Sequence, residues 1–199
     1  MANTEVNKHF IEKSTIFLAA ILQGLFLTYF VHPTSRSAMI AVVVTLAIGF
    51  LATKLWEQHR RHRYVTVLLV SGTVGGFGMA LGRWLDSQLI PAHHAHFTTN
   101  QSFLGHILSF EILLMLIFCI PACEFFCIRH VVAPSTGKRI LRSFECHGSM
   151  LAGMVIGGYL LSPFFSTMID AEVLVAHFSM VTGMIAGIWI GLKLTASLI

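Results

Sequence analysis

The chain contains six long apolar stretches with very few charged side chains, and these stretches limit what it can fold into. They cover residues 14–31, 38–56, 64–85, 103–128, 140–161 and 171–194. Each is close to the roughly 20 residues that a helix needs to cross a hydrocarbon layer about 30 Å thick. Charged residues make up 11% of the chain, whereas soluble domains have about 25%. So few charges could not cover a soluble core, and a bilayer explains the composition.

The apolar stretches favour helices over the strands of a membrane barrel. A barrel strand alternates apolar and polar residues over roughly ten positions, whereas these runs are continuous and about twice as long. No small-residue cleavage site follows the first stretch, which indicates a retained anchor and not a signal peptide. We therefore predict an all-α integral membrane protein, with residues 1–199 forming a single bundle of about six transmembrane helices.

The distribution of Lys and Arg predicts the orientation, because cytoplasmic loops retain positive charge. The segments after the second and fourth stretches are basic, with Lys54, Arg60, Arg61, Arg63, Arg129, Lys138, Arg139 and Arg142. Segments 86–102 and 162–172 contain no Lys or Arg. This pattern places both termini in the cytoplasm, and we expect a multi-pass protein of a bacterial inner membrane. Nucleic acid is excluded as a partner because the basic residues lie in short loops against the bilayer.

A repeated pattern in the last two stretches carries the most information about function. The pattern H-x-S-M-x-x-G-M-x-x-G occurs at residues 147–157 and again at residues 177–187. A part of it, without the histidine, recurs in the third stretch around Met79. Spacings of three and four residues place side chains on one face of a helix. Each repeat therefore predicts a His/Met stripe: His147, Met150 and Met154 on one helix, and His177, Met180 and Met184 on the other.

A line of small residues runs beside each stripe, and such lines let membrane helices approach closely. The two helices cross the membrane in opposite directions, so the stripes are predicted to be antiparallel. Counting depth from the ends of the apolar stretches at about 1.5 Å per residue pairs His147 with Met184, Met150 with Met180, and Met154 with His177.

Thioether and imidazole ligands suit soft metal ions, above all Cu(I). The sequence thus favours a membrane protein that binds or translocates copper, with the two stripes as ligands. The competing interpretation is that the methionines only pack, as flexible apolar side chains commonly do, and an internal duplication would copy packing residues as faithfully as ligands.

Other residues are weaker candidates for the same chemistry. Histidines that could capture a metal lie in or next to the segment between the third and fourth stretches: His93, His94, His96 and His106. Thiols occur at helical spacing in the fourth stretch and beside His147: Cys119, Cys123, Cys127 and Cys146. Glu111 is an acid inside the fourth stretch, and an ionisable residue at such a depth is a functional candidate.

Two alternatives remain open at this point. Intramembrane histidines are axial ligands in haem b proteins, and His106 with His177 would be the pair. The chain could instead be a non-catalytic subunit or assembly factor of a larger membrane complex, or a homo-oligomer, with the small-residue lines as interfaces. No catalytic motif is present, so an enzyme is the less favoured class.

Overall fold

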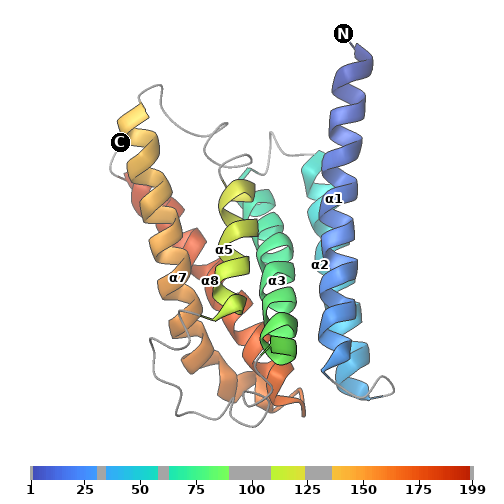
Figure 1. Cartoon of the computed structure of the whole chain (residues 1–199). Coiled ribbons are helices and arrows are strands. Elements are labelled where there is room, and N and C mark those ends of the chain that lie inside the picture. Colours follow the sequence, from blue (N-terminus) through green and yellow to red (C-terminus); the bar gives the residue numbers. More distant parts are fainter. Residues whose placement is uncertain (1, 31–34, 58–62, 90–108, 124–135, 198–199) are drawn as a thin grey trace.

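The computed structural model describes residues 2–30, 35–57, 63–89, 109–123 and 136–197. These residues form six α-helices: α1 (Ala2–Tyr29), α2 (Arg36–Glu57), α3 (Arg63–Leu89), α5 (Phe110–Cys123), α7 (Thr136–Ser166) and α8 (Glu172–Ser197). Successive helices run in opposite directions, and the N- and C-termini lie at the same end of the bundle (Figure 1). We call this the termini end and the other the opposite end.

The helices agree with a protein that crosses the bilayer several times. Within the described residues, four stretches are long and apolar enough to span it: Arg36–Leu55, Val67–Leu89, Phe144–Ser166 and Glu172–Gly191. The described apolar parts of α1 and α5 are shorter, Lys13–Tyr29 and Phe110–Ala122. The prediction of an all-helical multi-pass membrane protein is therefore confirmed, with four of the six predicted spans reaching full length.

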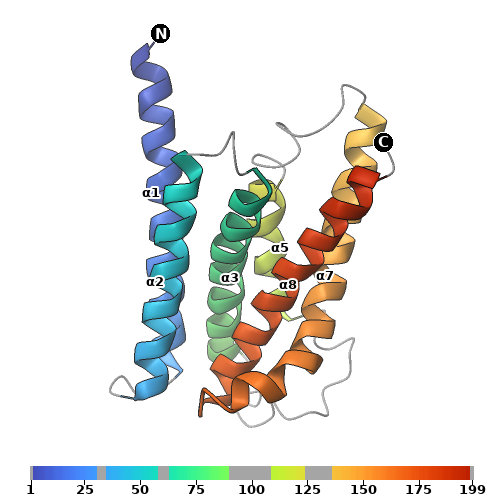
Figure 2. The same ribbon diagram turned by 180° about the vertical axis from the view of Figure 1, so that it is seen from behind.

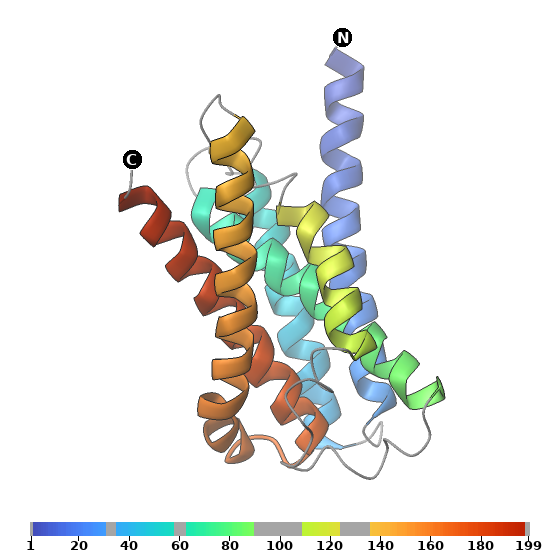
Figure 3. The same ribbon diagram turned by 60° about the vertical axis from the view of Figure 1, so that its left-hand side comes forward.

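Helix α3 lies in the middle of the bundle and contacts α1, α2, α5 and α8. The α1–α2 pair covers one side of it, and α7 packs chiefly against α8 (Figure 2). Figure 3 shows α8 running diagonally across α7 while α5 lies along α3. This arrangement encloses a core between α3, α5, α7 and α8.

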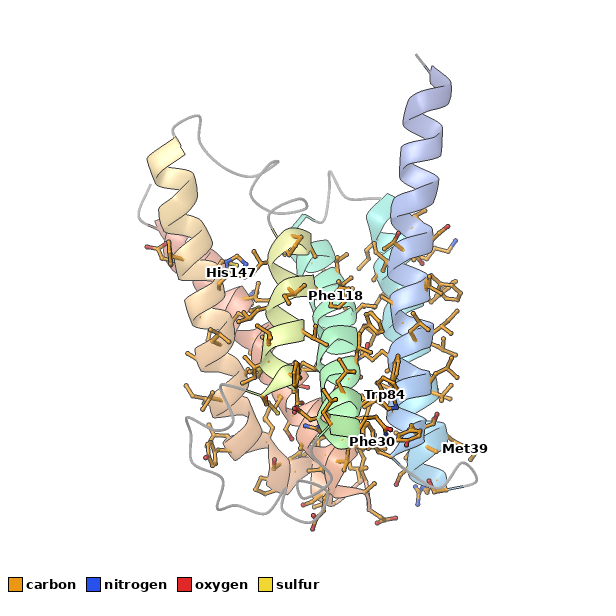
Figure 4. The ribbon with its side chains drawn as sticks, viewed as in Figure 1. Phe30, Met39, Trp84, Phe118 and His147 are labelled. Carbon is orange, nitrogen blue, oxygen red and sulfur yellow. The ribbon has the colours of Figure 1, made fainter. Side chains whose placement is uncertain are left out.

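The outer surface of the bundle is apolar, as a bilayer requires. Tyr159 and Leu160 on α7 are each 71% exposed, and Met39 on α2 is 62% exposed. Figure 4 shows Met39 on the outer side of α2. These faces imply direct contact with lipid.

Side-chain oxygens cap two of the helices at their N-termini. Ser35 Oγ accepts a hydrogen bond from the Ala38 amide at 3.1 Å, and Ser109 Oγ accepts one from the Ile112 amide at 3.4 Å. Each bond satisfies one of the backbone donors that the first helical turn leaves without an intrahelical partner. The two serines therefore fix where α2 and α5 begin.

Candidate metal centre

All the methionines of both repeats are buried in one cluster between α3, α5, α7 and α8. We call Met150, Met154, Met180 and Met184 the stripe methionines; their exposed fractions are 4% or less. The same cluster contains four further sulfur-bearing residues, Met79, Met115, Cys119 and Cys146. Six thioethers and two thiols thus line the centre of the bundle.

The glycines of the two repeats set how closely α7 and α8 approach. A Cβ atom added to Gly153 would lie 2.7 Å from Gly187 Cα and would also meet the carbonyl oxygen of Gly183. A Cβ on Gly157 would lie 2.9 Å from both the Gly183 nitrogen and the Ser179 oxygen. Only glycine allows such contact between backbones. The small-residue lines therefore form the interface between these two helices.

These contacts also fix the register of the antiparallel helices, and the predicted depth pairs are wrong. Because Gly153 faces Gly183 and Gly187, Met154 lies at the level of Met184, two turns away from the predicted partner. The prediction counted depth from the ends of the apolar stretches. The actual register follows from which glycine backbones can touch.

In the observed register, the methionines occupy the middle of the interface and the histidines its two ends. His147 lies near the termini end, and His177 lies near the opposite end. Their levels differ by about 20 Å along the helix axis, at 1.5 Å per residue. Figure 4 shows the His147 ring on the side of α7 that faces α5. One metal ion could not bind both imidazoles.

Sulfur atoms from three helices come together in the half of this core nearer the termini end. The Cys119 thiol on α5 donates a hydrogen bond to Met150 Sδ on α7, with 3.3 Å between the sulfurs. The position that a Cβ on Gly75 of α3 would take is 3.4 Å from Cys119 Sγ and 3.3 Å from Met184 Sδ. We call Cys119, Met150 and Met184 the three-sulfur centre.

The next turn toward the opposite end holds further thioethers. A Cβ on Gly78 of α3 would lie 2.9 Å from the Met115 Cα on α5, so Met79 and Met115 lie at one level. Both are fully buried in the same cluster as the stripe methionines. The sulfur lining therefore continues below the three-sulfur centre without a break in the cluster.

Glu111, predicted as an intramembrane acid, forms a buried ion pair with Arg83 of α3. Arg83 Nη2 donates to Glu111 Oε1 at 2.6 Å and Arg83 Nε to Oε2 at 3.3 Å, while Nη1 donates to the Val173 carbonyl at 2.8 Å. The two side chains are 4% and 1% exposed. This pair joins α3, α5 and the start of α8, so both carboxylate oxygens already serve a structural ion pair.

Sequence reasoning missed Arg83, although an arginine within an apolar stretch was a visible signal. It also missed Gln23 on α1, whose side-chain nitrogen donates to His177 Nε2 at 3.0 Å. Both side chains are buried, and His177 Nδ1 has no hydrogen-bond partner among the described residues. The imidazole thus belongs to a polar layer near the opposite end and not to the sulfur core.

Five of the candidate residues belong to segments outside the described part of the chain. His93, His94, His96, His106 and Cys127 lie outside the described residues, and only the backbone of Cys123, the last residue of α5, is described. Asp86 accepts hydrogen bonds from the Phe110 and Glu111 amides at 3.4 Å and so caps α5.

The described residues contain no group of three or more His, Cys, Asp or Glu side chains that could hold a metal ion. Donors for a metal in the described core would therefore be mainly thioethers. Comparison with family models, with curated proteins and with solved structures found no match to this chain.

Proposed function

We propose that this protein binds Cu(I) in its sulfur-lined core and carries it across the membrane. The observation that supports this most directly is the burial of every stripe methionine in one cluster with two thiols. Thioethers and thiols bind soft ions such as Cu(I), whereas Mg²⁺ and Ca²⁺ require oxygen ligands. Leucine is similar in volume to methionine and could fill the same positions. The chain instead has sulfur-bearing side chains there.

The length of the sulfur lining supports translocation as well as binding. The stripe methionines fill the middle of a series that begins at His147 and ends at the polar layer of His177, and this series extends over about 20 Å, about two thirds of a hydrocarbon layer roughly 30 Å thick. Neighbouring thioethers along this path offer successive weak sites, which a soft ion can leave as easily as it enters. We place the termini end in the cytoplasm, because basic residues lie in the helix ends there: Lys54 in α2, Arg63 in α3, and Lys138 and Arg139 in α7.

Haem binding is the less favoured alternative. His106, the predicted second ligand beside His177, lies outside the described residues, and the glycine contacts bring the backbones of α7 and α8 too close for a porphyrin between these two helices. His177 Nε2 already accepts a hydrogen bond from Gln23. A visible spectrum of the purified protein would show a Soret band if haem were present.

Metal analysis of the purified full chain tests the proposal. We expect about one or more copper ions per chain after loading with Cu(I), and no Soret band. Replacing the four stripe methionines by leucine, which is similar in volume, should abolish most of this binding. The control replaces Met39 and Met168, which are 62% and 60% exposed, by leucine. Equal copper in the stripe variant and the control would refute a ligand role for the stripes.

A further inference from the structure

The three-sulfur centre differs from the rest of the sulfur core because it combines a thiol with two thioethers. The sulfur atoms of Cys119 and Met150 are 3.3 Å apart. Met184 Sδ and Cys119 Sγ both lie next to the position that a Cβ on Gly75 would take. All three residues are fully buried. Two sulfurs that bind one metal at about 2.3 Å each can be up to roughly 4.6 Å apart. The Cys119–Met150 pair already meets this condition.

Gly75 provides space next to these sulfur atoms. Any larger residue would place a Cβ 3.3 Å from Met184 Sδ and 3.4 Å from Cys119 Sγ. Such a Cβ would lie between α3 and the three-sulfur centre. Because residue 75 is glycine, the side chains of Cys119 and Met184 can rotate toward a shared metal ion without meeting α3.

The surroundings of the centre determine which ionic charge it can accept. On α3 and α5 the charged residues facing the core, Arg83 and Glu111, lie two turns away and neutralise each other. On α7 and α8 the nearest charged side chains of the described part, Glu145 and Lys193, lie more than one turn away. Among the side chains that the structure describes, the nearest other titratable groups are Cys146 and His147, on the turn of α7 next to Met150.

When Cu(I) binds at Cys119, the metal ion replaces the thiol proton, and the negative charge of the thiolate balances the single positive charge of the ion. The S–H bond of Cys119 breaks, an S–Cu bond forms and the proton passes to water, while copper remains Cu(I). The resulting thiolate complex with two neutral thioethers carries no net charge. A divalent ion would leave one uncompensated charge in an apolar environment, where an isolated charge is very costly.

We propose that the three-sulfur centre is the primary metal site of this protein and that it selects monovalent soft ions, Cu(I) or Ag(I), over divalent ones. This assignment rests on the proposed function. It specifies which three residues bind the metal first and that the bound ion is monovalent. The other thioethers of the core then act as secondary sites along the path.

Binding titrations of the full chain in mild detergent test this assignment. Cu(I) is titrated anaerobically against a chromophoric Cu(I) chelator, with Zn²⁺ and Ag(I) as competitors. Cys119→Ser and Met184→Leu should each weaken Cu(I) binding at least about tenfold, since even residues that only orient ligands contribute 10–100-fold. Met168→Leu, at an exposed methionine, should leave the affinity unchanged. Ag(I) should displace Cu(I), and excess Zn²⁺ should not.

Gly75→Ala provides a second variant that removes no ligand. It should weaken Cu(I) binding while helix content and thermal stability remain near those of the parent. Gly148→Ala is its control, because a Cβ at Gly148 would meet nothing within 4 Å. X-ray absorption at the copper edge should show a first shell of sulfur in the parent chain.

The outcomes separate this inference from the proposed function. If the parent binds Cu(I) and the Cys119, Met184 and Gly75 variants bind it equally well, the three-sulfur centre is not the primary site and the proposed function stands. Displacement of Cu(I) by Zn²⁺ would overturn the charge argument. A parent chain that binds no Cu(I) would refute both.

Discussion

The buried Arg83–Glu111 pair makes a quantitative prediction about stability. Glu111→Gln keeps the size and one acceptor oxygen of the side chain but removes its charge. Glu111 Oε1 now accepts from Arg83 Nη2 at 2.6 Å, and Oε2 accepts from Arg83 Nε at 3.3 Å. In the variant, the amide NH₂ would replace one of these oxygens and would face a guanidinium donor. Arg83 would retain its bond to the Val173 carbonyl, but its positive charge would be uncompensated at a site where its side chain is 4% exposed.

The expected loss of unfolding free energy is large. A hydrogen bond to a charged group contributes about 1.5–3 kcal/mol, and breaking a buried pair by removing one partner costs about 3–5 kcal/mol. For a chain of about 200 residues, 1 kcal/mol shifts the Tm by roughly 2–4 °C. We therefore expect Glu111→Gln to lower the Tm by about 10 °C.

Thermal unfolding in mild detergent measures this change through reaction of a thiol-specific dye with chains in which Cys123 and Cys127 are replaced by serine. Cys119 and Cys146 are buried, so they react only when the bundle opens. Glu172→Gln is the matched control, because Glu172 is exposed in the first turn of α8, and it should change the Tm little. The double variant Arg83→Met/Glu111→Leu should be more stable than Glu111→Gln, since an apolar pair leaves no buried charge.

The reasoning is wrong if Glu111→Gln and Glu172→Gln unfold at the same temperature. It is also wrong if the double variant loses as much stability as Arg83→Met and Glu111→Leu, made singly, lose together. Either result would mean that the pair is hydrated in the folded protein and that its charges do not depend on each other.

Two further predictions concern the helix interface and the orientation. Gly153→Ala should lower the Tm by several degrees, because its Cβ would meet the backbones of Gly183 and Gly187 and overpacking costs about 1–3 kcal/mol. Gly148→Ala is the control and should be neutral or stabilising by up to about 1 kcal/mol. Equal effects of the two substitutions on the Tm would refute the glycine interface. Reporters active only in the cytoplasm should be active when fused to either terminus, and inactive when inserted after Asp170; the reverse pattern would place the termini end outside.

The sequence predicted the elements of this fold but not how they fit together. Apolar runs and the repeat identified the helices and placed the stripe methionines on shared faces, because both depend on local spacing. The register of α7 against α8 depends on contacts between residues far apart in the chain. The signal was present in Gly153, Gly157, Gly183 and Gly187, and aligning these glycines gives the observed register.

The polar contacts were hidden for a different reason. Glu111 was recognised as an unusual residue, but its partner Arg83 is 28 residues away in the sequence. The pair could be identified only from a structure in which α3 and α5 lie side by side. Gln23 and His177 come from opposite ends of the chain, with 154 residues between them. An arginine or a glutamine in an apolar stretch signals an intramembrane partner, but one sequence does not specify which residue that partner is.

The duplicated motif combines two functions on neighbouring helical faces, and this allows packing and ligand roles to be separated. Its glycines meet across α7 and α8, so replacing them should change stability. Its methionines point into the core that α3 and α5 complete, where leucine would fill nearly the same volume. A motif that only packs would tolerate leucine at the stripe methionines without loss of any property. Stability that survives these leucine substitutions, together with copper binding that does not, can be explained only if the sulfur atoms themselves bind the metal.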